Sequence, residues 1–300
     1  MIMVQLMSFG GKVGVNIFFL ISGYFLIRST MKWEKALKLT LEMLFYNILA
    51  CIILQSLGYN YTFKDYLGII PFIFSVPGFM STYIVIYILS PFLNKVLLSI
   101  NKKEHILLSA VLLGYFSILQ TFLGQNSWDY LGWGISLYII GGGIRLYKPK
   151  IGKNKTFGLA SLLCILLTWG GILFIDFWGV RHGHDHWHFF IGDANKLNIF
   201  AIALFMFLFF LNTNIKYNKI INLFASASFG VFLLHANNDI MRKWLWQDLF
   251  QNTEQLSSPS MWLHAIAATL AIYIVITPID IFRQHYIEKP LFKYISADEK

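Results

Sequence analysis

The chain has little charge, little cysteine and little proline, and these shortages narrow the class of protein. Only 13% of its 300 residues are charged, whereas 57% are hydrophobic and the mean hydropathy is +0.60. A soluble domain of this size would not tolerate so apolar a surface, so that class is excluded. The two cysteines, Cys51 and Cys164, lie within apolar runs, which favours buried thiols over a disulfide. The N-terminus lacks the pattern of a removable signal peptide.

Long apolar runs are what the chain has instead. They predict an all-α, polytopic transmembrane helix bundle, forming a single integral-membrane domain over residues 1–300, because each helix needs about 17–25 apolar residues to cross a bilayer. The run Tyr66–Phe74 is too short to cross and suits a re-entrant or interfacial segment. The nine predicted spans are Val13–Ile27, Leu37–Leu57, Thr82–Ile100, Ile106–Leu123, Leu131–Tyr147, Phe157–Phe177, Leu197–Leu211, Ile220–His235 and Trp262–Phe282.

The distribution of basic residues orients these spans. If the N-terminus is outside, 18 of the 24 Lys and Arg residues fall in inner loops or the C-terminal tail, as the positive-inside rule requires. The C-terminus is therefore expected in the cytoplasm. The net charge of +9 then reflects topology and contact with anionic membrane lipids, and no nucleic-acid partner is expected.

Four segments, in order along the chain, resemble the membrane-bound acyltransferase family (acyltransferase 3). The first is GGKVGVNIFFLISGYFLI at Gly10–Ile27, which resembles the family's Gly-Gly-x-Gly-Val and Ser-Gly-Tyr span. The other three are Ser81–Asn94 (STYIVIYILSPFLN), Phe229–His235 (FGVFLLH) and Ile279–Leu291 (IDIFRQHYIEKPL). The resemblance implies a membrane O-acyltransferase of the bacterial cytoplasmic membrane that modifies a surface or exported polysaccharide.

The family normally has ten core helices, and its first carries an Arg and a His with the central catalytic role. The segment that matches its second helix begins just after Met1. An odd number of predicted spans agrees with a missing first helix. Either the true start lies upstream of Met1, or the chain is an inactive homologue.

The resemblance also implies an acyl donor, acetyl-CoA or another acyl-CoA, that enters from the cytoplasm. A phosphate-rich donor needs cations, and Arg28, Lys32 and Lys35 lie just after the Ser-Gly-Tyr span, where the family has a basic element. The alternative is that these three charges only set the topology.

His235 is the main catalytic candidate, because an imidazole can take a proton from an attacking hydroxyl and return one to the leaving thiolate. Asn237 and Asp239 follow it and are candidates for binding the carbohydrate acceptor. The alternative is a hydrogen-bonded structural histidine at a helix end. Asn16 and Ser22 form a second candidate catalytic pair within a span. Equally, they and the nearby Gly14 and Gly23 can serve close helix packing.

An outer loop, Arg181–His188, reads RHGHDHWH. Its imidazoles and carboxylate suit a transition metal, but the alternating spacing fits no common zinc signature and no metal is expected. Trp187, His188 and Asp193 are instead candidates for contact with a glycan, through aromatic stacking and hydrogen bonding.

Other charged residues favour local structural roles. Asp280 and Arg283 are predicted to form an i,i+3 pair, and Glu288 and Lys289 a solvated helix end. Glu42 is predicted to reach back to Lys38, four residues earlier.

A polysaccharide transporter or a non-catalytic export accessory protein is the alternative function. A transporter predicts broken helices in paired positions of two repeats. Only Gly141–Gly143, Gly170–Gly171, Pro91 and Pro278 interrupt the spans, and no duplication is evident. The enzyme is therefore the favoured prediction.

Overall fold

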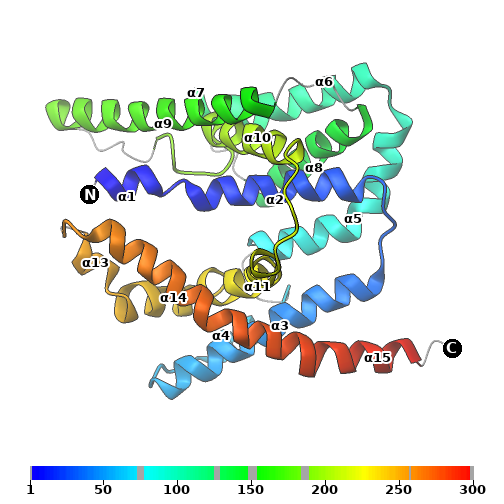
Figure 1. Cartoon of the computed structure of the whole chain (residues 1–300), viewed down its shortest axis with the longest axis vertical. Coiled ribbons are helices and arrows are strands. Elements are labelled where there is room, and N and C mark those ends of the chain that lie inside the picture. Colours follow the sequence, from blue (N-terminus) through cyan, green and yellow to red (C-terminus); the bar gives the residue numbers. More distant parts are fainter. Residues whose placement is uncertain are drawn as a thin grey trace. The chain divides into compact units, whose positions relative to one another are not determined.

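The computed structural model describes residues 2–72, 78–124, 129–147, 154–183, 189–256 and 258–297, and every regular element in these residues is a helix (Figure 1). The chain forms two compact units, each described separately below. The first unit contains Met1–Met31 and Val85–Asn214, and the second contains Lys32–Ile84 and Ile215–Lys300. A single integral-membrane domain over residues 1–300 stays a prediction.

The first unit contains helices from the N-terminal and central parts of the chain. They are α1 (Ile2–Met7), α2 (Gly10–Leu26), most of α5 (Phe79–Ser99), α6 (Lys102–Leu113), the π-helix η1 (Gly114–Ile118), α7 (Leu119–Phe122), α8 (Tyr130–Tyr147), α9 (Asn154–His182) and α10 (Leu197–Leu211).

The second unit joins an early segment to the C-terminal third of the chain. It contains α3 (Trp33–Ser56), α4 (Phe63–Gly68), α11 (Lys219–Ala236), α12 (Asp239–Lys243), the π-helix η2 (Trp244–Leu249), α13 (Asn252–Gln255), α14 (Met261–Phe282), the π-helix η3 (Arg283–Glu288) and α15 (Lys289–Ala297).

Seven helical segments in the described residues are long and apolar enough to cross a membrane. This confirms the all-α, polytopic fold. Seven of the nine predicted spans fall on these segments, whereas Leu197–Leu211 forms a shorter apolar helix and Leu131–Tyr147 lies in α8, outside the seven. The segments are Val4–Leu26, Trp33–Ser56, Phe79–Ser99, Lys102–Phe122, Asn154–Gly179, Lys219–Ala236 and Met261–Lys293.

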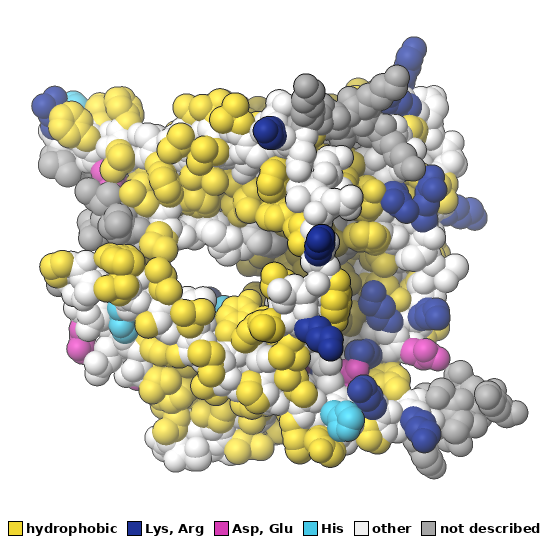
Figure 2. Space-filling view, in the orientation of Figure 1, with side chains coloured by type: hydrophobic (Ala, Val, Ile, Leu, Met, Phe, Trp, Pro, Cys, Tyr) yellow, Lys and Arg dark blue, Asp and Glu magenta, His cyan; other side chains and the backbone are white. Residues whose placement is uncertain are grey.

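The outer surfaces of these helices are apolar. Leu107, Leu167 and Ile274 are each more than 60% exposed, and Figure 2 shows hydrophobic side chains over much of the visible face. A soluble protein would not leave so many large apolar side chains in water. The surfaces are therefore suited to contact with lipid, and the protein is a multi-pass membrane protein.

Small residues allow α2 and α8 to pack closely in the first unit. A Cβ atom on Gly23 would lie 2.7 Å from the backbone carbon atoms of Tyr138, and one on Gly141 would collide with the carbonyl oxygen of Leu20. The predicted packing role of Gly23 is therefore confirmed. The same prediction for Gly14 is wrong, because a Cβ atom there would meet nothing within 4 Å.

These two glycines provide a matched test of the packing. We expect Gly23→Ala to lower the free energy of unfolding by about 1–3 kcal/mol, because the backbone of Tyr138 cannot move without separating the helices. Gly14→Ala should leave it unchanged or raise it by up to about 1 kcal/mol, the usual helix-propensity gain. Thermal unfolding of both variants in detergent measures the difference, and equal effects would contradict the close α2–α8 contact.

Candidate functional site

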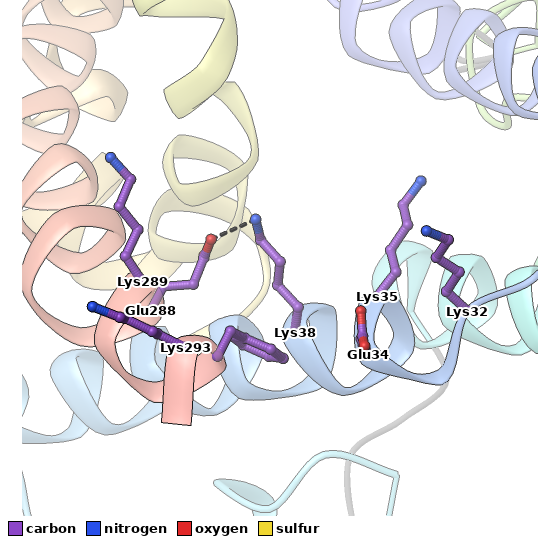
Figure 3. Close-up of a pocket in the computed structure, with 8 residues that line it drawn as sticks. Lys32, Glu34, Lys35, Lys38, Glu288, Lys289 and Lys293 are labelled. Carbon is purple, nitrogen blue, oxygen red and sulfur yellow. Dashed lines mark ion pairs between the residues drawn. The ribbon is translucent and has the colours of Figure 1, made fainter. Parts of the chain in front are cut away.

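A basic pocket of about 580 Å³ lies in the second unit, between the start of α3 and the chain's last helices (Figure 3). Five lysines, two glutamates and one phenylalanine line it, so the lining carries three more positive than negative charges. Such a lining suits an anion with several charges, because each lysine carries its positive charge on a long, flexible stem. The lining residues are Lys32, Glu34, Lys35, Lys38, Glu288, Lys289, Phe292 and Lys293.

Two of the three predicted donor-binding residues line this pocket. Lys32 and Lys35 are there, whereas Arg28 is an exposed residue of the first unit. Sequence reasoning missed Lys38 and Phe292 as lining residues. The sequence did contain a signal for Lys38, because Lys32, Lys35 and Lys38 recur every three residues. It contained none for Phe292, because only the tertiary fold brings α15 to the start of α3.

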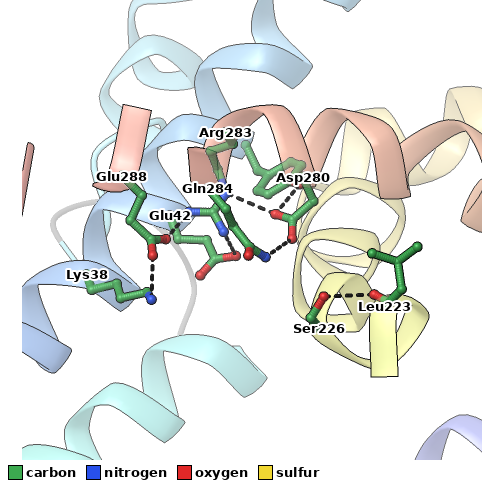
Figure 4. A network of polar contacts seen from close by, with 9 residues as sticks. Lys38, Glu42, Leu223, Ser226, Asp280, Arg283, Gln284 and Glu288 are labelled. Carbon is green, nitrogen blue, oxygen red and sulfur yellow. Dashed lines mark hydrogen bonds and ion pairs between the residues drawn. The ribbon is translucent and has the colours of Figure 1, made fainter. Parts of the chain in front are cut away.

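A buried network of ion pairs lies next to the pocket, with Arg283 at its centre (Figure 4). The Arg283 side chain is only 5% exposed. Its Nη2 donates to Oε1 of Glu42 at 2.7 Å and its Nε donates to Oδ1 of Asp280 at 2.9 Å. Its Nη1 donates to Oε2 of Glu288 at 2.7 Å, and the other oxygen of Glu288 pairs with Lys38. One arginine therefore holds three carboxylates.

The contacts of Asp280 extend the network to α11. Asp280 accepts hydrogen bonds from Tyr46 Oη at 2.9 Å and from Gln284 Nε2 at 2.6 Å. A Cβ atom on Gly230 of α11 would lie 2.8 Å from Oδ1 of Asp280. Only glycine at this position lets α11 approach the network.

These contacts correct two predictions and confirm a third. Glu42 pairs with Arg283 rather than Lys38, because a helix-spaced cation at the pocket is less favourable for a buried carboxylate than a buried guanidinium with several donors. Glu288 is not solvated, since its side chain is only 12% exposed. The predicted pair of Asp280 and Arg283 is confirmed, but it belongs to a larger set.

His235 lies in the last turn of α11. Its Nδ1 is 2.6 Å from the carbonyl oxygen of Val231, and because a carbonyl can only accept, Nδ1 carries the proton. In the neutral ring Nε2 then keeps its lone pair and can act as a base. The rings of Phe232 and Trp246 approach the imidazole edge to face, with centroids 6.1 and 6.0 Å away. The ring is therefore half-buried and held in one orientation.

The two predicted acceptor residues after His235 have partners of their own. Asn237 donates from Nδ2 to Oδ1 of Asn47 on α3 at 3.2 Å. Asp239 is exposed and pairs with Arg242 at 2.9 Å. The structure thus places Asn237 between α3 and the end of α11, whereas Asp239 faces solvent at the start of α12. Their roles toward an acceptor stay predictions.

Asn16 and Ser22 lie in the first unit and are both engaged. Asn16 donates from Nδ2 to the carbonyl of Ala194 at 2.7 Å and accepts from Nε1 of Trp133 at 2.8 Å. Ser22 donates to the carbonyl of Phe18, one turn earlier, at 2.7 Å. These contacts suit the packing role that the sequence left open, and a part in catalysis stays a prediction.

Asp193 lies shortly before α10. It accepts from Nε2 of Gln120 at 3.2 Å, and Lys196 donates to the backbone carbonyl of Gln120 at 3.1 Å. Burial lowers the pKa of Lys196, an effect that the nearby negative charge of Asp193 opposes in part. Trp187 and His188, the other predicted glycan contacts, lie outside the described residues.

The histidine-rich loop is only partly described. Residues 184–188 lie outside the description, and His182 stacks on Trp178 with ring centroids 4.4 Å apart. In the part of the chain that the structure covers, no three His, Cys, Asp or Glu residues form a group that could hold a metal ion. Cys51 and Cys164 are free thiols, as predicted, but only Cys51 is buried and Cys164 is half-buried.

The helices define a polytopic membrane protein, and the lining of its pocket is basic. Comparison with known families adds the chemistry, because the family model described as an acyltransferase domain, acyltransferase 3, matches residues 1–279. The chain belongs to this family and is a membrane acyltransferase, transferring groups other than amino-acyl groups. No curated protein and no solved structure matches the chain.

Proposed function

We propose that the protein transfers an acyl group, with acetyl as the first candidate, from cytoplasmic acyl-CoA to a hydroxyl of a cell-surface or exported polysaccharide. The observation that carries the donor assignment is the basic pocket with its five lysines and Phe292. Acyl-CoA carries several phosphates, which lysines attract, and an adenine ring, which can stack on an aromatic side chain. The pocket offers both kinds of contact within one unit.

The membrane orientation supports the donor side. Lysines gather at the start of α3 and in α15, and clustered basic residues at helix ends favour the cytoplasmic side. This orientation leaves the C-terminus in the cytoplasm of a bacterial cell, where acyl-CoA is made. In this orientation Asn47, past the middle of α3, and His235 near it lie farther from the cytoplasmic end of α3 than the pocket does.

The separation of the basic pocket and His235 along α3 is compatible with a long, flexible donor. Lys38 lines the pocket, and Asn47, nine residues later on α3, contacts Asn237 near His235. Nine residues of helix rise by about 13.5 Å. An acyl group on the extended arm of coenzyme A is suited to bridge such a span while the phosphates stay with the lysines.

The residues near His235 supply the proposed chemistry. Nε2 of His235 takes the proton of the acceptor hydroxyl as its oxygen attacks the thioester carbonyl. The carbon–sulfur bond then breaks, and the coenzyme A thiolate takes a proton back from the imidazolium. The new ester stays on the sugar, and the histidine returns to its starting state.

Deletion and complementation test the function. We expect deletion of the gene to remove ester-linked acyl groups from the surface glycan, and the wild-type gene to restore them. Lys32→Gln with Lys35→Gln should raise the KM for acyl-CoA at least about tenfold, because two charged contacts to phosphate are lost. Transfer of labelled acetyl from acetyl-CoA in membranes measures this.

The matched control removes two lysines elsewhere. Lys102 and Lys103 are exposed residues of α6 outside the pocket. Their replacement by glutamine should leave the KM within about twofold, since they do not line the pocket and exposed charges are screened by salt. Unchanged ester content after deletion would contradict the proposed function, and equal effects of the two double variants would contradict the pocket as the donor site.

A further inference from the structure

Glu288 is a carboxylate that lies between two cations of different kinds. Its Oε2 accepts from Arg283 at 2.7 Å, and its Oε1 pairs with Lys38 (Figure 4). Glu288 and Lys38 both line the basic pocket. A negative charge therefore lies in the wall of a pocket whose five lysines attract anions.

The two cations hold Glu288 unequally. The Arg283 side chain is 5% exposed and is also bound to Glu42 and Asp280, so it cannot move away. The Lys38 side chain is 45% exposed and has a long, flexible stem. An ion pair with one exposed partner is weaker than a buried one and more easily exchanged. Glu288 is thus fixed on one side, whereas its lysine partner can turn to another anion.

The π-helical turn η3 makes this arrangement possible. In an ordinary α-helix, residues five apart lie roughly 140° from each other around the axis, so Arg283 and Glu288 would point in different directions. The wider turn of a π-helix brings such residues into register. Arg283 and Glu288 are the first and last residues of η3. The backbone irregularity, which is frequent at functional sites, thus serves to hold one carboxylate at the pocket.

We propose that Glu288 is a built-in counter-anion of the donor pocket and acts as a positioning residue. It holds Lys38 in place while the pocket is empty, and a donor phosphate displaces it from Lys38 when the donor binds. On release, Glu288 recaptures Lys38 and so favours departure of the spent coenzyme A. This inference rests on the proposed function of the pocket, and the ligand class is a polyphosphate such as the coenzyme A head group.

The test is titration of the purified full-length protein with free coenzyme A in detergent at low salt. We expect Glu288→Gln to lower the Kd for coenzyme A about two- to fivefold, the range open to one partly exposed charge pair. The neutral glutamine can still accept from Arg283, which keeps Glu42 and Asp280. The variant should therefore fold, and its thermal unfolding checks this.

A second carboxylate of the pocket supplies the matched control. Glu34 also lines it, so Glu34→Gln removes the same charge without breaking the pair of Glu288 with Lys38, and it should lower the Kd less than twofold. In a Lys38→Gln background, Glu288→Gln should likewise lower the Kd less than twofold, because the competition for Lys38 is gone. A Glu288→Gln variant that binds coenzyme A as weakly as the wild type, or more weakly, overturns the inference.

Inorganic pyrophosphate separates this inference from the proposed function. If coenzyme A does not bind but pyrophosphate does, and binds more tightly to Glu288→Gln, the counter-anion is confirmed and the acyl-CoA assignment fails. If coenzyme A binds the wild type and Glu288→Gln does not tighten it, only the counter-anion fails. If neither probe binds, the pocket takes no phosphate and both are overturned.

Discussion

Replacing Arg283 with glutamine should destabilise the protein by about 3–5 kcal/mol, the effect expected when one partner of a buried ion pair is removed. The variant would leave Glu42, Asp280 and Glu288 close together without the guanidinium. The side chains of Glu42 and Asp280 are only 6% and 0% exposed, so water cannot replace the lost donors. We expect little of this variant to accumulate in membranes, and a lower unfolding temperature in detergent for what remains.

An exposed arginine in the same unit is the matched control. Arg242 pairs with Asp239, but their side chains are 56% and 84% exposed. Arg242→Gln should therefore cost less than about 1 kcal/mol. Adding Glu42→Gln to Arg283→Gln should restore part of the loss, because one uncompensated buried charge disappears. If Arg283→Gln and Arg242→Gln unfold at the same temperature, the network does not stabilise the fold.

The network also shows where sequence reasoning stops. Lys38 lies four residues before Glu42, and that spacing is typical of a helical ion pair. The actual partner of Glu42 is Arg283, 241 residues away. The local sequence pattern does not show that Arg283, rather than the nearby Lys38, is the partner of Glu42. Only the fold, which brings η3 next to α3, determines this partner.

Helical periodicity alone could have shown that Gly14 and Gly23 do not both pack against one neighbouring helix. Gly14 and Gly23 are nine residues apart, which places them roughly 180° from each other on a helix. They cannot both face the same neighbour, and Gly23 is the one that meets α8. Hydropathy, in contrast, predicted seven membrane-length helices, because that signal is local in the chain. The family-like basic element after the Ser-Gly-Tyr span pointed to two of the pocket lysines, Lys32 and Lys35. The lining from α15 required the tertiary fold.

The state of His235 also depends on atoms that the sequence does not specify. The family-like segment Phe229–His235 indicated a histidine at a helix end but not which nitrogen is free. The carbonyl of Val231 fixes the proton on Nδ1, and the rings of Phe232 and Trp246 fix the plane. The sequence thus predicts His235 as the base, and the structure identifies Nε2 as the nitrogen atom that can play this role.

We expect His235→Asn to lower kcat for acyl transfer by roughly 10²–10⁴-fold, the usual contribution of a positioned acid–base group. Asparagine can still donate to the carbonyl of Val231, so the end of α11 keeps its hydrogen bond, but it offers no basic nitrogen in place of Nε2. The KM for acyl-CoA should change less than about threefold, because His235 does not line the pocket. Labelled acetyl transfer, normalised to folded protein, separates the two constants.

His264 is the matched control for this loss. It lies in the same unit, its Nε2 is 2.9 Å from Oδ1 of Asn252, and its ring faces Phe250. His264→Gln removes an imidazole of similar burial but should leave kcat within about twofold. If His235→Asn keeps kcat within threefold of wild type, a different group takes the proton. If both variants lose activity and unfold early, His235 is a structural residue, because the loss of a base lowers kcat in a protein that stays folded.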